Sequence, residues 1–286
     1  FYLSRKFFAN SVEEILNSAE SFGKNNLLEG KKIMVEYTDP NPFKPFHIGH
    51  LMSNVIGESI SRLVEFSGAE VVRANYQGDL GLHVAKAIYG LLENEKLQSK
   101  AGSNALQASN IGRAYASGAE LYEIDEKAKK EIDEINKKLY IKSDNKKDKK
   151  INEIYDWGFR VTMEAFEDLY KILGTKFDFY FLESVMADIG QDIVNGNIGK
   201  IFEESDGAIV FKAEKYDPKL HTRVFITSQG LPTYETKELG LTEEKFKTYP
   251  EMDLSIMVTA NEQMDYMRVV MKVIFLIHPE HAAKMR

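Results

Sequence analysis

Two histidines, His47 and His50, follow a proline-rich turn and precede an apolar, helix-like segment. Residues three apart on the first turn of a helix lie on the same side, so both imidazoles could reach one ligand. Imidazoles donate hydrogen bonds and transfer protons, and the free N–H groups at a helix N-terminus bind phosphate. The pattern from His47 through Gly49 to His50 therefore predicts a nucleotide-phosphate site, with capping or packed histidines as one alternative.

A zinc site is the other alternative for this histidine pair. Zinc is held by histidine, cysteine and carboxylate ligands, and its structural sites need four of them. The chain contains no cysteine, and its other histidines are scattered, at positions 83, 221, 278 and 281. We therefore expect no protein-held metal.

The turn before the histidines carries three more polar side chains and three of the chain's seven prolines. Lys44 could neutralise phosphate charge, or it could simply be solvated. Asp39 could cap the turn, and Asn41 could do the same or bind a ligand through its amide. With the prolines and Lys44 in front of them, the histidines favour a functional site over a structural one.

Three further segments carry candidate residues. Gly78 and Asp79 lie in a loop with flexible backbone, for which a plain turn is an equal alternative. Tyr234 and Glu238 are four apart on a predicted helix, where an aromatic ring beside a carboxylate could bind a planar guanidinium. Such pairs are also common on helix surfaces. Gln263 follows a predicted strand.

The spacing of apolar residues predicts the elements that position these side chains. The first part of the chain reads as strand, helix, strand and helix, at residues 33–37, 48–67, 70–76 and 82–92. Such alternation builds a parallel sheet, whose ligands bind at the carboxyl ends of the strands. The loops that carry His47 and Gly78 both lie at those ends.

Residues 93–173 read as long helices, and strands resume afterwards at 177–181, 208–211, 223–227 and 254–258, with helices at 234–246 and 262–276. The predicted fold class is α/β: a Rossmann-like parallel sheet interrupted by a helical insertion. The expected parts are a helical remnant of an N-terminal region (1–30), the first half of the Rossmann-like domain (31–92), the insertion (93–175) and the second half (176–286).

The composition is that of a globular protein, with 43% hydrophobic and 28% charged residues among 286. No apolar run approaches the roughly 18–20 residues of a membrane helix. Without a signal-peptide pattern or cysteine, a cytoplasmic protein is expected. The net charge of −7 argues against a uniformly basic nucleic-acid surface, and the lysine-rich stretch at 138–150 is more typical of a solvated loop than of a nucleic-acid contact.

Taken in order, these segments resemble the arginyl-tRNA synthetases, a family of class I aminoacyl-tRNA synthetases. Residues 35–51 resemble the family's extended form of the class I nucleotide motif, and residues 75–81 resemble the segment that follows it. Residues 234–239 are similar to the arginine-recognition helix, and residues 258–263 to a later strand and loop with its glutamine. Residues 1–8 resemble the tail of the family's N-terminal domain.

The resemblance implies ATP-dependent activation of L-arginine to arginyl-adenylate and transfer to tRNA(Arg). The catalytic residues it implies are His47, His50 and Lys44. The ATP-binding residues it implies are His47, Gly49, His50, Gly78 and Asp79. The arginine-binding residues it implies are Glu36, Asp39, Asn41, His50, Glu183, Tyr234, Glu238 and Gln263. Mg²⁺ would arrive with ATP, no membrane is involved, and a monomer is favoured.

Three features depart from the family pattern. Glu238 stands where the family usually has aspartate, and Leu80 stands where it usually has tryptophan. The chain ends at Arg286 before the lysine-bearing loop that stabilises pyrophosphate, so we expect an excised catalytic core that is weakly active or inactive alone. The alternatives are a paralogue that binds arginine or tRNA without charging, and another class I synthetase or nucleotidyltransferase with the same histidine motif.

Overall fold

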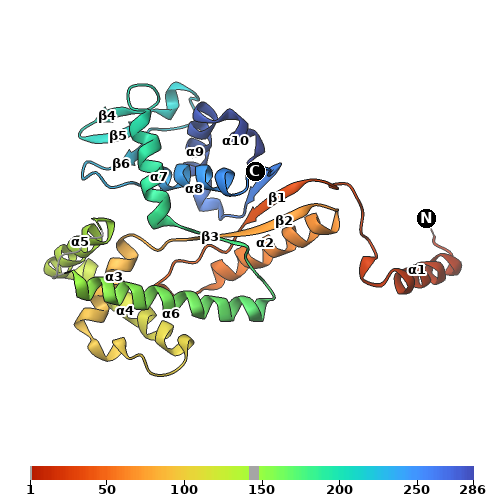
Figure 1. Cartoon of the computed structure of the whole chain (residues 1–286), viewed down its shortest axis with the longest axis horizontal. Coiled ribbons are helices and arrows are strands. Elements are labelled where there is room, and N and C mark those ends of the chain that lie inside the picture. The colour runs from red at the N-terminus through yellow and green to blue at the C-terminus, as the bar shows by residue number, and fades with distance from the viewer. Residues whose placement is uncertain (1, 142–147) are drawn as a thin grey trace.

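A four-stranded parallel sheet forms the centre of the computed structural model, which describes residues 2–141 and 148–286 (Figure 1). Its strand order is β3-β2-β1-β7, and each neighbouring pair is parallel. The strands are β1 (Lys32–Glu36), β2 (Glu70–Gln77), β3 (Phe179–Leu182) and β7 (Leu254–Met257). The sheet confirms the predicted α/β class, and its order places β1 between strands from opposite ends of the sequence.

Helix α2 (Ile48–Phe66) connects β1 to β2 and packs directly on β1. The close approach depends on Gly57, because a Cβ there would lie 2.1 Å from the Tyr37 ring. Ile33, Val35 and Tyr37 are buried in one cluster with Phe166 and other residues of the later chain. A strand with a continuous apolar run is typical of the centre of a parallel sheet covered on both faces.

The insertion is a helical bundle with its own core, lying on one side of the sheet (Figure 1). It contains η2 (Glu95–Gln98), α4 (Asn104–Ile124), α5 (Glu126–Ile141) and α6 (Lys149–Leu173), and α3 (Leu82–Glu93) packs into it. Gly90 and Gly118 let α3 and α4 touch, since a Cβ at either would lie about 2 Å from a carbonyl oxygen of the other helix (2.1 and 2.0 Å).

The middle of the lysine-rich stretch, residues 142–147, lies outside the described residues, so the interpretation of that stretch is tested only at its ends. There, Lys138 forms an ion pair with Asp148, with 3.0 Å between Nζ and Oδ1.

The second half of the chain adds a small antiparallel sheet that the sequence did not predict. The strands expected at 208–211 and 223–227 do form, as β5 (Ala208–Phe211) and β6 (Arg223–Ile226), but they join β4 (Glu203–Ser205) in a separate sheet of order β4-β5-β6. Short connections between strands favour antiparallel pairing, since parallel pairs need a long crossover.

Helices α7 (Glu183–Gly196), α8 (Tyr234–Thr248), α9 (Met264–Ile277) and α10 (Pro279–Lys284) complete this half, with η3 (Ala213–Lys215) and η4 (Asn261–Gln263). Helix α7 was not predicted. It packs tightly on α8 through two glycines, because a Cβ at Gly190 would lie 1.9 Å from the Thr236 carbonyl oxygen and one at Gly240 would lie 2.1 Å from that of Met186. This packing holds α8 in a fixed position relative to the end of β3.

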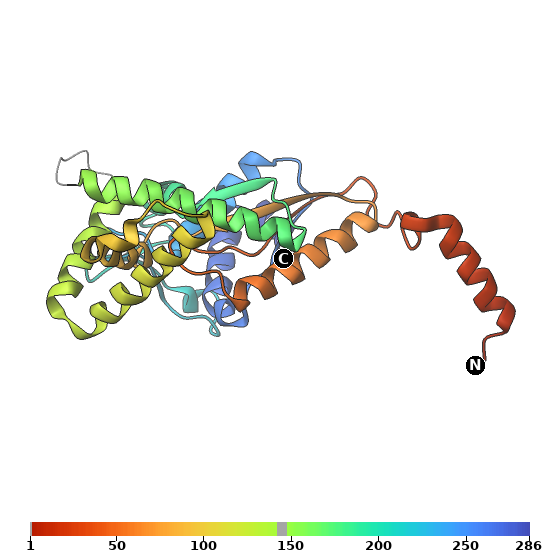
Figure 2. The same cartoon turned by 90° about the horizontal axis from the view of Figure 1, so that it is seen from below.

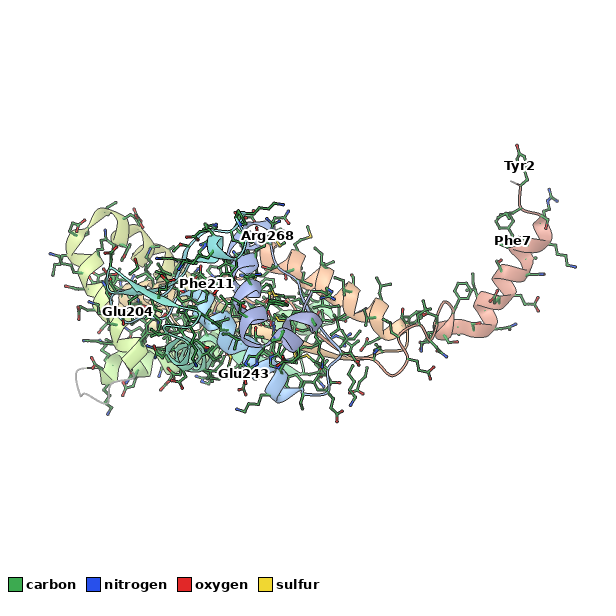
Figure 3. All side chains as sticks on the ribbon, turned by 90° about the horizontal axis from the view of Figure 1, so that it is seen from above. Tyr2, Phe7, Glu204, Phe211, Glu243 and Arg268 are labelled. Atoms are coloured by element: carbon green, nitrogen blue, oxygen red, sulfur yellow. The ribbon has the colours of Figure 1, made fainter. Side chains whose placement is uncertain are left out.

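Helix α1 (Arg5–Ser18) projects away from the rest of the molecule (Figure 2) and is followed by η1 (Ala19–Ser21). It buries none of its residues, and Figure 3 shows Tyr2 and Phe7 at its far end. Within residues 2–141 and 148–286, every helix is too short or too polar to cross a membrane.

Candidate functional site

The turn after β1 holds an unusual backbone conformation. Thr38, Asp39 and Phe43 have φ angles of 79°, 46° and 67°, a region that favours glycine. Such strain persists only where surrounding contacts enforce it, and it gathers at functional sites. Here the Thr38 N–H donates to Ser53 Oγ (2.9 Å), and the Asp39 carboxylate accepts the Tyr76 N–H (2.7 Å). The turn is therefore tied to both α2 and β2.

His47 and His50 cap the N-terminus of α2 reciprocally. His47 Nδ1 accepts the Gly49 N–H (3.1 Å), and His50 Nδ1 accepts the His47 N–H (3.3 Å). The two rings stack with centroids 3.7 Å apart. Gly49 is needed for this arrangement, because a Cβ there would lie 2.9 Å from the His47 ring. The capping alternative is thus realised, and it leaves Nε2 of each ring available.

The caps also define what these rings can do chemically. An imidazole that accepts through Nδ1 carries its proton on Nε2 when it is neutral, so it is a donor on that side. Burial, helped by His47 and Lys44, lowers the pKa of His50 to about 4, so His50 is neutral at physiological pH. His47 is exposed. The pair therefore presents Nε2–H donors beside a helix N-terminus, which suits phosphate oxygens.

Lys44 lies beside the histidines, with Nζ 5.5 Å from the centre of the Tyr115 ring on α4. Burial lowers its pKa, while the Glu183 carboxylate opposes that change. Helix α4 therefore forms part of the surroundings of Lys44, whereas the sequence had associated Lys44 with the turn alone.

Asn41, Gly78 and Glu183 meet at the carboxyl ends of three strands. A Cβ at Gly78 would lie 1.9 Å from Asn41 Oδ1 and 3.5 Å from Glu183 Oε1, so glycine is required for their approach. Glu183 forms a buried ion pair with Lys237 of α8, with 2.8 Å between Oε2 and Nζ. Burial lowers the pKa of Lys237, but Glu183 outweighs it and holds the pKa above its usual value.

Asp79 is a buried connection between parts of the molecule. Its carboxylate accepts the Ser184 N–H at the start of α7 (2.8 Å) and the Tyr155 hydroxyl of α6 (2.8 Å). A carboxylate is favourable at a helix N-terminus. Both oxygens are engaged by protein groups, so Asp79 holds α6 and α7 against the loop after β2.

A cluster of carboxyl groups lies between the turn and α8: Glu36, Asp39 and Glu238, with Lys245 among them. Glu36 forms a buried ion pair with Lys245. Burial raises the pKa of Asp39 well above its usual value, and Glu36 adds to the rise. Burial and then Glu36 raise the pKa of Glu238 to about 8. Among the described residues, no hydrogen bond or ion pair reaches the Glu238 carboxylate.

Two tyrosines complete the surroundings of this acidic cluster. Tyr76 at the end of β2 is buried, and its hydroxyl has no hydrogen-bond partner among the described residues. Burial raises its pKa, and so do Glu183 and Glu238. Burial also raises the pKa of Tyr266 on α9, and Glu238 makes the largest contribution among the carboxylates. A buried polar group without a partner is costly, and a bound ligand would supply one.

The remaining predicted residues lie further out. Tyr234 is 62% exposed, and the Lys237 ammonium lies 5.2 Å from its ring centre. Gln263 is exposed in η4, and the described contacts do not connect it with the acidic cluster. Sequence reasoning missed Lys237, Lys245 and Tyr266. Lys245 is seven residues after Glu238 on the same face of α8, and that spacing was the available signal, but lysines on helices are usually solvated.

The fold and the site together define a Rossmann-like nucleotide-binding domain of the class I synthetase type, with the histidine motif at the carboxyl edge of a parallel sheet. The chain belongs to the family described as "tRNA synthetases class I (R), catalytic domain", whose model matches residues 11–282.

The chain is similar to part of several proteins that are named arginine--tRNA ligase. The chain is 30% identical over 273 residues to an arginine--tRNA ligase of Borreliella afzelii, covering 92% of this chain and 45% of that protein. It is also 30% identical over 286 residues to an arginine--tRNA ligase of Clostridium botulinum, covering 99% and 48%. The chain thus spans about half the length of the curated relatives it matches.

A solved structure supports the same fold. The match to the arginyl-tRNA synthetase of Thermus thermophilus covers 96% of this chain and 50% of that chain, with a TM-score of 0.67 and 21% sequence identity.

Proposed function

We propose that this chain supplies the core of an enzyme that activates L-arginine with ATP and transfers it to tRNA(Arg), as the names of its relatives indicate. The observation that carries the proposal is the acidic cluster. Glu36, Asp39 and Glu238 lie around Lys245, with a partnerless tyrosine hydroxyl beside them. Among the described residues, carboxyl groups here outnumber cations, so the site favours a cationic ligand.

A guanidinium fits this surplus better than an ammonium ion does. It is permanently charged and planar, and it binds carboxylates through two parallel hydrogen bonds. Among the residues that the structure describes, no side chain pairs with the Glu238 carboxylate, so we assign it the guanidinium, with Tyr234 and Gln263 closing over the ligand when it binds. Asp39, Asn41, His50 and the Glu183 region would hold the backbone of the amino acid.

On the other side of the turn, the histidines and Lys44 would bind ATP. The arginine carboxylate attacks the α-phosphorus, the bond to the bridging oxygen breaks, and pyrophosphate leaves. Negative charge spreads over the α-phosphate oxygens in this transition state, and the Nε2–H group of His47 can donate to them. Gly49 and Gly78 allow backbone to approach the nucleotide. Mg²⁺ would come with ATP, and ATP and tRNA as substrates favour a cytoplasmic location.

Arginine-dependent exchange of pyrophosphate into ATP by the full-length protein, with tRNA present and absent, tests the proposal directly. We expect exchange with arginine and none with citrulline, which has the same length but an uncharged end group. Exchange with citrulline or lysine as strong as with arginine would contradict the assignment of Glu238. Arginine binding without exchange or charging would instead support the second candidate, a binding paralogue.

A thermal-shift screen separates this proposal from other class I enzymes. Each of arginine, cysteine, glutamate and glutamine is added together with ATP. We expect stabilisation by arginine alone, since the anionic side chain of glutamate would be repelled by Glu36 and Glu238. Preferential stabilisation by any of the other three would favour a different class I specificity.

A further inference from the structure

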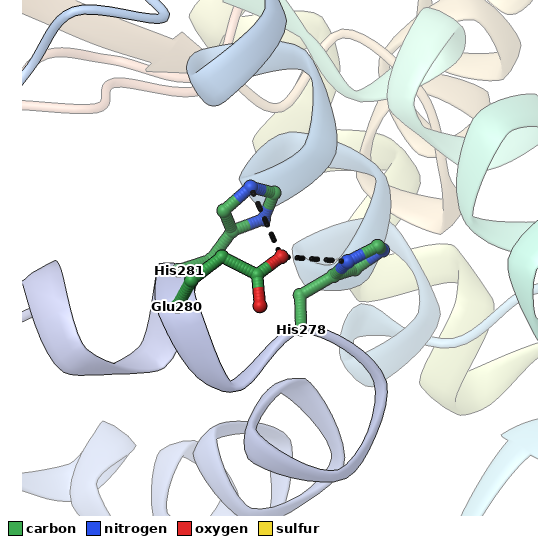
Figure 4. Close-up of side chains that lie close together, drawn as sticks. All are labelled: His278, Glu280 and His281. Carbon is green, nitrogen blue, oxygen red and sulfur yellow. Dashed lines mark hydrogen bonds and ion pairs between the residues drawn. The ribbon is translucent and has the colours of Figure 1, made fainter.

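The corner between α9 and α10 carries a second cluster of reactive side chains: His278, Glu280 and His281 (Figure 4). The sequence interpretation counted these histidines as scattered. His278 caps both the end of α9 and the start of α10, and His281 lies on the first turn of α10, so the two rings are neighbours, with centroids 4.8 Å apart.

The three side chains are spaced like the ligands of a small metal ion. His278 Nδ1 lies 3.3 Å from Glu280 Oε1, and His281 Nε2 lies 3.9 Å from the same oxygen. One ligand atom of each residue lies within 4.8 Å of the others. Ligands about 2.0–2.1 Å from a tetrahedral ion are about 3.3 Å apart, so a small movement of the exposed Glu280 and His278 side chains would suffice.

A carboxylate outside the cluster determines which nitrogen of His278 is available. Glu243 of α8 lies 3.5 Å from His278 Nε2. A histidine that ligates a metal almost always donates its other N–H to a carboxylate, which sets the tautomer and orients the ring. His278 Nδ1 shares a hydrogen bond with Glu280 Oε1 (3.3 Å). A bound ion would take the place of that proton, which would leave Nε2–H for Glu243.

His281 is held in place by packing against the same helix. Its ring stacks on Phe246 of α8, with centroids 4.0 Å apart and planes 3° from parallel. Stacking fixes the ring, so little side-chain freedom remains to be lost on binding. Helix α8 thus orients the rings of both His278 and His281, and the ligand atoms of these rings face the α9–α10 corner.

We propose that His278, Glu280 and His281 bind one divalent ion of the zinc type, with Glu243 as the residue that positions His278. Two nitrogen ligands and one carboxylate suit Zn²⁺, Co²⁺ or Ni²⁺, whereas Mg²⁺ and Ca²⁺ prefer oxygen ligands alone. The ion would link residues of the α9–α10 corner, with water as the fourth ligand, beside α8, whose Glu243 lies against His278. We call this three-ligand site the clamp.

Zinc binding by the purified protein, with any affinity tag removed, tests the clamp. Isothermal titration with Zn²⁺ should show one equivalent per chain that His278→Ala loses. Co²⁺ should give visible absorption typical of tetrahedral nitrogen and oxygen ligation. At a zinc concentration about 100 times Kd, Tm should rise by about 5 °C, and Mg²⁺ should produce no such rise.

The variants separate the clamp from other histidines. Glu280→Gln should weaken zinc binding at least about tenfold without unfolding the protein, since this side chain is 62% exposed. Glu243→Ala should weaken it about 10- to 100-fold. His221→Ala is the matched control, an exposed histidine outside the cluster, and should leave binding unchanged. The proposal would be overturned if the protein bound no Zn²⁺. It would also be overturned if both His278→Ala and Glu280→Gln still bound one equivalent of Zn²⁺ with unchanged affinity.

Discussion

The carboxyl edge of the parallel sheet has two parts: a histidine half around His47 and His50, and an acidic half around Glu36, Asp39 and Glu238. The two halves differ in whether the protein itself provides hydrogen-bond partners for their polar groups. Around the histidines, both Nδ1 atoms accept backbone N–H groups, and the turn is fixed to α2 and β2. Around Glu238, burial holds the pKa of a carboxyl group at about 8, and a tyrosine hydroxyl lacks a partner among the described residues.

If the proposed function holds, this difference predicts how each half binds its ligand. The histidine half is rigid and complete, so it can stabilise charge that develops during a reaction without reorganising. In the acidic half, burial and the neighbouring Glu36 favour the protonated form of Glu238, and a bound cation would favour its ionised form. Changes in the first half should therefore alter rates, and changes in the second half should alter affinity and its dependence on pH.

The largest expected effect is on the rate, from His47→Asn. Asparagine is a good N-cap, so it keeps the bond to the start of α2 but lacks the outward Nε2–H donor. We expect the rate of adenylate formation to fall about 10²–10³-fold in single-turnover measurements. Arginine affinity and Tm should change little.

His47→Ala is the companion variant, because it removes the cap as well as the donor. It should lose the same rate and also about 1 kcal/mol of stability. If His47→Asn kept full activity, His47 would be a cap alone.

The second effect is on affinity, from Glu238→Gln. The glutamine is nearly isosteric but cannot form a charged pair with the guanidinium, so arginine binding should weaken by about 1.5–3 kcal/mol, roughly 10- to 150-fold. Calorimetry with arginine measures it. Glu244→Gln on the same helix is the control and should bind normally. An unchanged affinity in Glu238→Gln would move the guanidinium to another carboxylate.

The sequence predicted the histidine half better than the acidic half. The pattern from His47 to His50 and the strand before it are local, so their spacing alone predicts a helix N-terminus with two rings on one side. The environment of Glu238 depends on contacts between residues far apart, such as the pair between Glu36 and Lys245, separated by most of the domain. Periodicity contains no information about such pairs.

The same reason explains the errors in the fold. The parallel strands were predicted because each contains apolar or aromatic residues between clear turns, whereas β4 (Glu203–Ser205) is polar and three residues long. Helix α7 was missed, although glycines at its contact with α8 fix its position. Close helix packing is a property of two surfaces and is not visible in either segment alone.

The third effect is the dependence of arginine affinity on pH. Only the ionised form of Glu238 pairs with the guanidinium, and its pKa is about 8 in the free protein. Apparent affinity should therefore rise about tenfold per pH unit below 8 and level off above it, and binding near pH 7 should release a proton. Calorimetry in buffers of different ionisation enthalpy measures that proton. A flat profile from pH 6 to 9 would contradict it.

The smallest effect is on stability without ligand. The pKa of Glu238 is about 8 in the folded state against a usual value of 4.5, so between those values the folded protein binds a proton that the unfolded chain does not. Stability therefore falls as pH rises through this window. Glu238→Gln removes this dependence, so its Tm should exceed that of the parent by about 5 °C at pH 8.5 and by little at pH 5. Thermal unfolding in the presence of EDTA measures this without metal effects. Equal Tm values at pH 8.5 would show that Glu238 is not held protonated, and the contrast between the two halves of the edge would then rest on affinity alone.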